Sequence, residues 1–328
     1  MSKNLNLNKA RRVKCDEFYT QLSDIEKELR HYKSHFKNKV ILCNCDDPRI
    51  SNFFHYFSHN FKILGLKKLI TICYKNQQRD MFSQNDSERA IYLEYTGTRS
   101  GKNVPSPKAI GVKRLEGDGD FRSKECIELL QQADIVVTNP PFSLFREYIA
   151  QLIEYDKKFL IIGNVNAVTC KEVFKLVKGN EIWLGVSIHS GDREFGVPSY
   201  YPLNAAGCRV DSQGNKYIRV KGVRWFTNLD YTERHEDLVL YKTYNRQDYP
   251  KYDNYDAINV DKTAEIPMDY DGVMGVPITF LDKYNPEQFE IVGESSYHDK
   301  QDCAKPINFI NGKMIYHRIL IRNKQIKR

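Results

Sequence analysis

The segment DIVVTNPPF, residues 134–142, decides how the rest of the chain is interpreted. Its apolar half predicts a buried strand, and the NPPF turn at residues 139–142 follows that strand without a spacer. The two prolines fix the backbone and remove two N–H donors, so the turn is rigid and ends the strand. Ligands of α/β proteins bind at the carboxyl ends of such strands. The segment therefore predicts a binding site at the edge of a parallel sheet.

Strands and helices alternate on both sides of this segment. Apolar runs that predict strands lie at residues 39–43, 68–74, 91–95, 112–116, 159–163 and 182–186. Helical patterns lie at residues 16–36, 52–61, 123–130, 144–155 and 171–178, and Ser51 and Ser123 are placed to cap two of these helices. This alternation indicates βαβ units and a mainly parallel sheet, and hence an α/β fold with a Rossmann-like core.

The alternation ends after Val186. Residues 187–222 are rich in Gly, Pro, Ser and Asn and predict an irregular insertion, and one more strand is expected at 224–229. Residues 244–256 are expected to form a loop or linker, and short strands are expected within 272–292 and 314–322. We therefore expect three regions: 1–37, a basic arm plus a helix; 38–240, a catalytic domain; and 241–328, a further region.

Composition excludes several classes of protein. The 328 residues are 41% hydrophobic and 28% charged, which suits a folded core, and the mean hydropathy is −0.59. No apolar run approaches the roughly 20 residues of a membrane helix, and the polar N-terminus does not resemble a secretory signal, so a cytoplasmic protein is expected. A net charge of +8 suits nucleic-acid binding, although an ordinary basic protein fits equally well.

The NPPF turn has a specific chemical use. The side-chain oxygen of Asn139 and the carbonyl of Pro140 are two acceptors on a rigid turn, and Pro141 extends that turn. Two acceptors suit an NH₂ group on a nucleobase, because accepting both hydrogens frees the nitrogen lone pair for attack. Phe142 offers a ring on which an extruded base stacks. The simpler alternative is that the prolines only end a strand.

Further segments resemble the EcoRI-type family of adenine-N6 DNA methyltransferases, along most of the chain from about Asp16. They are DEFYTQ (16–21), CNCDDPRISNFF (43–54), GDGDFRS (117–123), DIVVTNPPFSLFREY (134–148), YDKKFLIIGNVNAV (155–168), WFTNLD (225–230), YPKYDNYDAINV (249–260) and GVMGVPITFLDKYNPEQFE (272–290). The resemblance implies a seven-stranded, mainly parallel S-adenosylmethionine-dependent methyltransferase core with a C-terminal target-recognition region at 241–328. It also implies methyl transfer to N6 of a flipped adenine in duplex DNA.

The resemblance further implies the modification half of a restriction–modification system, with GAATTC as the best guess for the site. The functional counterpart is then a restriction endonuclease that need not contact this chain, and a monomer is compatible with the sequence. Two other readings stay open: a protein-glutamine or ribosomal-RNA methyltransferase, which also carries an N-P-P-[YF] turn, or a DNA-binding protein of this fold that has lost the cofactor.

Candidate residues for the cofactor and for DNA follow from the same resemblance. The loop at 43–47 lies where the family usually has a Gly-rich turn, but it has no glycine. The residues assigned to the cofactor are Tyr19, Thr20, Cys43, Asn44, Asp46, Asp118, Asp120 and Phe121. Asp46 is suited to the methionine ammonium, and Asp120 with Phe121 to the adenine; a helix cap and a plain turn are the respective alternatives.

Basic side chains provide the candidates for DNA phosphates. These are Lys9, Arg11, Arg12 and Lys14 in the arm, and Arg224 later in the chain. For any one of them a solvated surface charge is the simpler reading. The eight cysteines include no C-x-x-C pair and the eight histidines no H-x-x-H, so no metal site is expected and the thiols are expected to be reduced.

Overall fold

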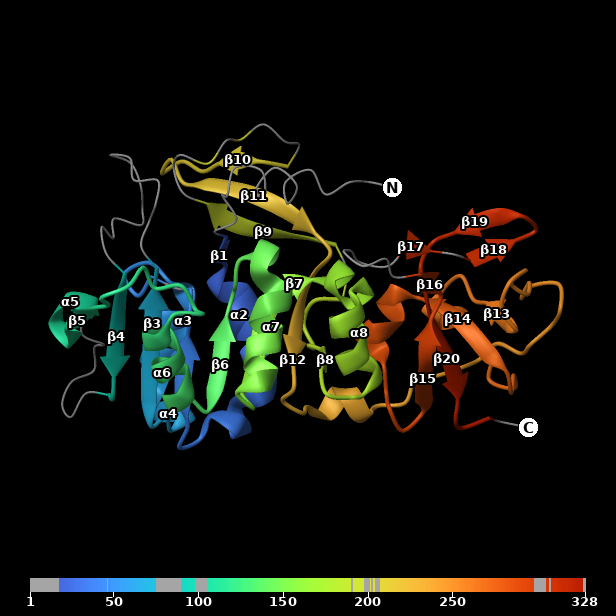
Figure 1. Ribbon diagram of the computed structural model, residues 1–328, viewed down its shortest axis with the longest axis horizontal. Helices are drawn as coiled ribbons and strands as arrows, with labels where there is room; N and C mark the ends of the chain where they lie inside the picture. Colours follow the sequence, from blue (N-terminus) through green and yellow to red (C-terminus); the bar gives the residue numbers. More distant parts are fainter. Residues whose placement is uncertain are drawn as a thin grey trace. The chain divides into compact units, whose positions relative to one another are not determined.

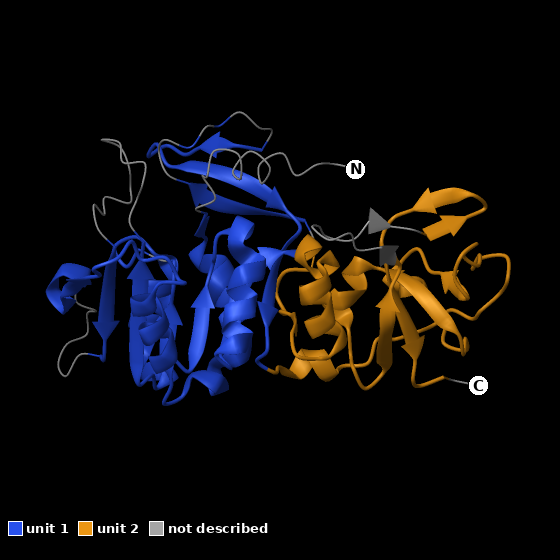
Figure 2. Cartoon of the chain, in the orientation of Figure 1, with its two compact units in different colours: residues 1–164, 190–229 blue, residues 165–189, 230–328 orange. Residues whose placement is uncertain are grey.

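The computed structural model divides the chain into two compact units. Unit 1 comprises residues 1–164 and 190–229, and unit 2 comprises residues 165–189 and 230–328 (Figure 2). The structure describes residues 18–45, 47–74, 90–97, 106–189, 191–197, 201, 203, 207–297, 305–306 and 308–326. The units are defined by contacts alone, so the functional division at 37 and 240 stays a prediction.

A large mixed sheet forms the centre of unit 1 (Figure 1). Its strands in this unit lie in the order β5 (Val112–Arg114), β4 (Ile91–Tyr95), β3 (Lys68–Cys73), β2 (Val40–Cys43), β6 (Ile135–Thr138), β7 (Lys158–Asn164) and β12 (Val223–Thr227). The central strands β3, β2, β6 and β7 are parallel, while β4, β5 and β12 join antiparallel. The expected parallel arrangement thus holds at the centre of the sheet.

The helices of unit 1 bury apolar side chains, except the one at Pro107–Ile110, which has no buried residue. They are α2 (Leu22–Leu29), η1 (Arg30–Phe36), α3 (Asn52–His59), α4 (Phe61–Leu64), α5 (Pro107–Ile110), α6 (Lys124–Gln132), η2 (Phe142–Leu144) and α7 (Phe145–Glu154). Ser51 caps α3 by accepting from the N–H groups of Phe53 and Phe54, and Ser123 caps α6 by accepting from Cys126. Both predicted caps are confirmed, and they fix where the helices begin after the β2 and β5 loops.

A second, smaller sheet in unit 1 departs from the sequence-based expectation. It has the order β1 (Tyr19–Thr20), β9 (Asp192–Val197), β11 (Lys216–Lys221) and β10 (Arg209–Val210), all antiparallel. The helix expected from residue 16 therefore begins only at Leu22, and residues 187–222 are not simply irregular. In β11 the side chains of Ile218 and Val220 are buried and their neighbours point outward, a period of two typical of a half-buried strand.

Unit 2 is built around a four-stranded sheet. The strand order is β13 (Ala257–Asn259), β14 (Val273–Pro277), β20 (Arg318–Asn323) and β15 (Phe289–Glu294). The other elements are η3 (Val165–Thr169), α8 (Lys171–Lys178), β8 (Trp183–Leu184), η4 (Thr232–His235), η5 (Thr263–Glu265), η6 (Ile278–Lys283) and the strand pairs β16 (Ser296–Tyr297) with β17 (Lys305–Pro306) and β18 (Asn308–Ile310) with β19 (Lys313–Ile315). The strands expected within 272–292 and 314–322 are confirmed.

Two further expectations concern the whole chain. Among the described residues no helix has the length and apolar character needed to cross a membrane. The thiols of Cys43, Cys45, Cys73, Cys126 and Cys208 are reduced, as expected. Cys170 is disulfide-bonded, which departs from the expectation of reduced thiols.

Candidate active site

The NPPF turn lies where the sequence predicted it, directly after β6. The side-chain amide of Asn139 donates from Nδ2 to the backbone carbonyl of Phe18 at 2.7 Å. Because a carbonyl only accepts, this bond fixes the orientation of the amide and leaves Oδ1 as the free acceptor. Oδ1 is buried and has no hydrogen-bond partner within the described part of the chain. An acceptor of this kind costs about 1–3 kcal/mol unless a partner such as a ligand or a water molecule binds it.

An aromatic cluster surrounds the end of this turn. It consists of Phe18, Phe142, Phe195 and Tyr201. The ring of Phe142 is 6% exposed and lies edge-on to Phe18 and Phe195, with centroids 5.5 and 6.4 Å away. Phe18 in turn lies 5.8 Å from Phe195 and 6.4 Å from Tyr201. The ring expected to stack on a base is therefore packed against other rings, two of them from the segment around the small sheet.

The loop after β2 is joined to the NPPF turn by one buried side chain. The hydroxyl of Thr138, the last residue of β6, donates to the backbone carbonyl of Asn44. Asn44 is 3% exposed, and its Oδ1 accepts from the backbone N–H of Cys45 at 2.9 Å. Cys45 has a φ of 67°, the left-handed conformation that a glycine usually supplies. The loop thus makes its sharp turn without glycine, while Cys43 is buried in β2.

The acidic residues of this loop have different surroundings. Asp46 lies outside the described residues. The carboxylate of Asp47 is buried and accepts from the backbone N–H of Arg49 at 2.9 Å and from its Nε at 2.8 Å. The backbone carbonyl of Asp47 also accepts from Ser51 at 2.7 Å. Asp47 therefore stabilises the loop and the start of α3.

The GDGDF loop lies after β5. Asp120 accepts from Nε of Arg122 at 2.9 Å and from Nη2 at 2.6 Å, and this pairing lowers the pKa of Asp120 below its usual value. Asp118 is exposed, and its Oδ1 accepts from the N–H of Asp120 at 3.0 Å. Phe121 is 4% exposed and packs edge-on against Tyr148 of α7 with centroids 5.0 Å apart. In this arrangement Asp118 is the acid that faces solvent, while Phe121 is part of the core.

Gly119 brings the GDGDF loop against the end of β3. It has a φ of 80°, and a Cβ atom at this position would lie 2.8 Å from the Cα of Tyr74 and 2.8 Å from the Cβ of Ala90. Such a distance is far too short for any side chain. The loops that follow β5 and β3 therefore meet because residue 119 is a glycine.

Tyr19 and Thr20 form β1 and pair with β9. Thr20 is 4% exposed, its carbonyl accepts from Nδ2 of Asn52 at 2.7 Å, and its buried Oγ1 has no partner among the residues that the structure describes. Tyr19 lines a cavity of about 160 Å³ together with Gln21, Ile50, Asn52, Gly196, Val197, Asn215, Lys216 and Tyr217. Asn52 stands at the start of α3, so β1 is tied to the helix that follows the β2 loop.

Comparison with known proteins bears on this geometry. The profile of the family described as "Adenine-specific methyltransferase EcoRI" matches residues 6–324. The chain is 55% identical to the type II methyltransferase M.EcoRI of Escherichia coli, over 98% of this chain and 97% of that protein. It is 39% identical to the type II methyltransferase M.MgeORF184P of Mycoplasma genitalium, over 98% of this chain and 99% of that protein. It is 38% identical to the type II methyltransferase M.MpnI of Mycoplasma pneumoniae, over 97% of this chain and 98% of that protein. No solved structure matches the chain.

The chain belongs to the EcoRI family of adenine-specific methyltransferases. It is an adenine-specific DNA methyltransferase, as the sequence segments predicted. The large mixed sheet of unit 1 is consistent with this family. The family membership does not by itself assign roles to single residues.

The structure does not favour one residue predicted to bind DNA in this methyltransferase. Arg224 lies in β12, between Val223 and Trp225, and it is 3% exposed. Its Nη1 donates to the carbonyl of Val223 at 2.8 Å. The guanidinium of Arg224 is therefore buried in the sheet in this structure, and its assignment to a DNA phosphate stays a prediction. Lys9, Arg11, Arg12 and Lys14 lie outside the described residues.

Sequence reasoning missed three residues that position the site: Phe18, Asn52 and Thr138. Phe18 contributes a backbone carbonyl, which no sequence pattern marks. Asn52 contributes one side-chain hydrogen bond to the backbone of β1, and Thr138 contributes one to the backbone of the loop after β2. Only Thr138 had a usable signal, since a hydroxyl in the last position of an otherwise apolar strand needs a partner.

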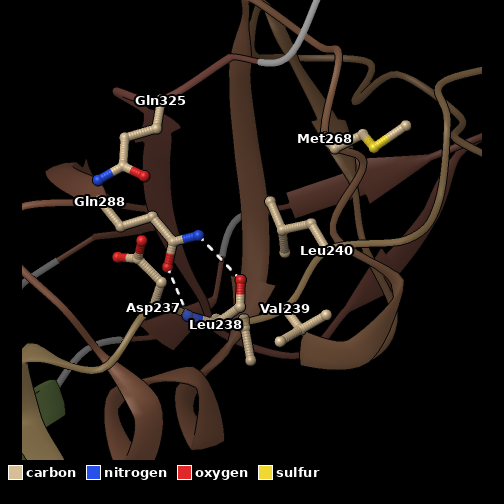
Figure 3. Close-up of a pocket in the computed structure, with 7 residues that line it drawn as sticks. All are labelled: Asp237, Leu238, Val239, Leu240, Met268, Gln288 and Gln325. Atoms are coloured by element: carbon tan, nitrogen blue, oxygen red, sulfur yellow. Dashed lines mark hydrogen bonds between the residues drawn. The ribbon is translucent and has the colours of Figure 1, made fainter.

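A second cavity, of about 140 Å³, lies in unit 2 of the methyltransferase (Figure 3). It is lined by Asp237, Leu238, Val239, Leu240, Met268, Gln288 and Gln325. The side chain of Gln288 holds the chain at Leu238, accepting from its N–H at 2.7 Å and donating to its carbonyl at 2.9 Å. Among the described residues no group of three or more His, Cys, Asp or Glu side chains is placed to hold a metal ion.

Proposed function

We propose that this methyltransferase transfers a methyl group from S-adenosylmethionine to N6 of an adenine that is extruded from duplex DNA. The observation that carries the proposal is the state of Asn139. Its Oδ1 is buried and unpartnered among the described residues, and its amide is fixed by the carbonyl of Phe18 at 2.7 Å. An acceptor held in this way is preorganised for an amino group that enters the site.

The proposed chemistry needs positioning more than acid–base groups. S-adenosylmethionine supplies a methyl group on a positive sulfur, which leaves as a neutral thioether. Asn139 Oδ1 and the carbonyl of Pro140 accept hydrogen bonds from the two hydrogens of N6, so the nitrogen lone pair is freed for in-line attack. The additional proton leaves N6 after transfer, through Asn139 or water. Pro141 keeps the turn rigid, which holds both acceptors in place.

Several features support a cofactor site beside this turn. The loops after β2, β3 and β5 meet at the same edge of the sheet as NPPF, with Thr138 and Gly119 fixing their approach. Thr20 offers a buried hydroxyl with no partner among the described residues. We propose that Tyr19, Thr20, Cys43, Asn44 and Asp46 form the methionine side of this site. Asp118, Asp120 and Phe121 form the adenine side.

The adenine side of the proposed site offers two carboxylates, Asp120 and Asp118. Asp120 is paired with Arg122 at 2.6 Å, yet its side chain is 31% exposed, and a carboxylate has lone pairs for a further donor. Asp118 is exposed without such a pair in the described region. The ring of Phe121 already packs on Tyr148, so we propose that Phe121 borders the adenine with its backbone and with one edge of its ring.

Base stacking on Phe142 requires space within the aromatic cluster. The ring is only 6% exposed, and Phe18 and Phe195 contact its faces or edge. We propose that the entering adenine replaces one of these ring contacts. Because stacking of a base on a ring contributes about 1–3 kcal/mol and edge-to-face ring pairs about 0.5–1.5 kcal/mol, the exchange is favourable or neutral.

We further propose GAATTC as the methylated sequence. Its support is the 55% identity to M.EcoRI along nearly the whole of both chains, including unit 2. The role is then protection of host DNA from a matching restriction endonuclease, without required contact between the two proteins. Residues 241–328 are proposed to read the target, and Lys9, Arg11, Arg12 and Lys14 to contact phosphates.

The test is transfer of labelled methyl groups from S-adenosylmethionine to plasmid DNA, ribosomes and release factor in parallel, followed by sequencing of modified bases. We expect label in DNA alone and N6-methyladenine in GAATTC. Label in ribosomes or release factor would replace the proposal with one of the other amino-methyltransferases. Absence of S-adenosylmethionine binding by calorimetry would indicate a DNA-binding protein without activity.

A further inference from the structure

Strands β18 and β19 form a tight hairpin in unit 2 (Figure 1). The turn consists of Asn311 and Gly312, with φ values of 51° and 70°. Two successive left-handed residues are the signature of the two-residue turn that matches the twist of a hairpin. Phe309 pairs with Met314 across the strands, so these two side chains lie on the same face.

One face of this hairpin is anchored to the core of unit 2. Ile310 and Ile315 pack against a cluster formed by Tyr252, Ala257 and Leu320. At the edge, Asn308 is fully buried and its Nδ2 donates to the carbonyl of Tyr316 at 2.9 Å. The inner face therefore fixes the position of the strands.

The tip of the hairpin is also held. The carboxylate of Asp253 accepts from the N–H of Asn311 at 3.1 Å and from the N–H of Gly312 at 2.8 Å. The N–H of Asp253 donates to the carbonyl of Phe309 at 2.8 Å. The hairpin is thus preorganised up to its turn, and a rigid element loses little entropy when it binds.

The outer face is apolar and open to solvent. On this face Phe309 is 37% and Met314 60% exposed, and Tyr316, the residue directly after β19, is 66% exposed. They are three of the nine large apolar side chains that are exposed in the described part of the chain, and they lie within eight residues. Apolar side chains gathered on one rigid face are typical of a binding surface rather than of scattered surface residues.

The surrounding sequence is strongly basic. Residues 295–328 contain eight Lys or Arg and two Asp, a net charge of +6 out of +8 for the whole chain. Lys313, next to the turn, is exposed and forms no ion pair with any described residue. Arg318 and Arg322 of this segment pair with Asp261 and Glu290. The remaining positive charges of the segment complement a polyanion.

From these observations we infer that the outer face of the β18–β19 hairpin enters the major groove of duplex DNA and reads the target. A two-stranded ribbon fits the width of this groove, and apolar side chains such as Met314 suit the methyl group of thymine. Asn311 in the turn suits base edges. Lys313 pairs with Ile310 and so lies beside the turn on the other face of the ribbon, where it suits a flanking phosphate. The inference rests on the proposed function in taking duplex DNA as the ligand.

The test measures equilibrium binding rather than methyl transfer, so it does not depend on the proposed chemistry. The probes are the duplex that the wild-type protein selects most tightly from a randomised pool, and a scrambled duplex. We expect Met314→Ala and Tyr316→Ala each to weaken binding of the selected duplex about tenfold and of the scrambled duplex far less. Lys313→Gln should lower the salt slope by about one for both duplexes.

Val239→Ala is the control, because Val239 is an apolar residue of the same unit with 81% exposure and lies outside residues 241–328. It should bind both duplexes as the wild type does, and near-UV circular dichroism should be the same for all variants. The inference is overturned if the hairpin variants bind the selected duplex like the wild type, or if Val239→Ala weakens binding as much as they do. A wild type that binds DNA but transfers no methyl group would refute the proposed function instead.

Discussion

Asn139→Ala should lower the rate of methyl transfer strongly while leaving the free energy of unfolding nearly unchanged. The substitution removes an acceptor that has no partner among the described residues of the free protein but, as we propose, binds N6 in the transition state. Loss of one such preorganised group costs about 2.7–4 kcal/mol, or about 100- to 1,000-fold in kcat. Loss of the hydrogen bond from Nδ2 to the carbonyl of Phe18 should lower the free energy of unfolding by about 1 kcal/mol. Removal of the buried, unpaired Oδ1 should raise it by about 1–3 kcal/mol.

The two stability effects oppose each other, so the free energy of unfolding should stay within about 1 kcal/mol of the wild-type value or rise. The assay is single-turnover methylation at saturating DNA and cofactor, together with urea unfolding of the free protein. Cofactor affinity should be retained, since Asn139 is proposed to contact the target amine.

Asn228→Ala is the control with the opposite pattern. Its Oδ1 accepts from the N–H of Phe159 at 2.8 Å and its Nδ2 donates to the carbonyl of Lys157 at 3.0 Å, so both groups are satisfied. Removing them should destabilise the fold by about 1–3 kcal/mol and leave the rate per folded molecule nearly unchanged. If Asn139→Ala keeps its rate within a few-fold, or loses stability as Asn228→Ala does, the role proposed for the turn is wrong.

Other perturbations test the remaining parts of the site. Phe142→Ala should reduce the fluorescence change of 2-aminopurine at the target position and slow methylation, while Phe142→Tyr keeps most activity; unchanged signals would make Phe142 a core residue only. Thr138→Val should raise the Kd for S-adenosylmethionine about tenfold, and Thr138→Ser should restore it, because only the hydroxyl bond to the β2 loop differs. Gly119→Ala should destabilise unit 1 by at least about 2 kcal/mol in urea unfolding, since φ is 80° and the new Cβ meets backbone at 2.8 Å. Arg122 lowers the pKa of Asp120, so this ion pair stabilises the fold above the unfolded-state pKa, and its contribution is lost as the pH falls through the folded-state pKa. Arg122→Gln should therefore lower the free energy of unfolding by less than about 1 kcal/mol at neutral pH. In acid, urea titrations should show no difference between the variant and the wild type.

The elements around the NPPF turn could be predicted because their signals are local. The run before Asn139 is apolar throughout, and the caps at Ser51 and Ser123 stand where apolar periodicity begins. Each of these features is set by neighbours in the sequence. The parallel pairing of the central strands then follows from the alternation of strands and helices.

Features that depend on distant pairing could not be predicted in this way. Strand β1 is two residues long, too short for any period, and it exists because Tyr19 and Thr20 pair with Gly196 and Phe195 far along the chain. The burial of Arg224 can be predicted from its neighbours in the sequence. Val223, Trp225 and Phe226 surround it, so the arginine lies in a buried strand rather than on a basic surface.

The pairing of β1 with β9 also explains how a segment outside the large sheet bears on the proposed chemistry. Phe18, next to β1, supplies the carbonyl that orients Asn139 and the ring that lies 5.5 Å from Phe142. Phe195 in β9 contacts both of these rings. A displacement of β1 would therefore change the acceptor and the stacking ring together. The entry of the base and the orientation of the Asn139 amide are therefore coupled through one short strand. For this reason substitutions at Phe18 should affect both the flipping of the adenine and the rate of methyl transfer.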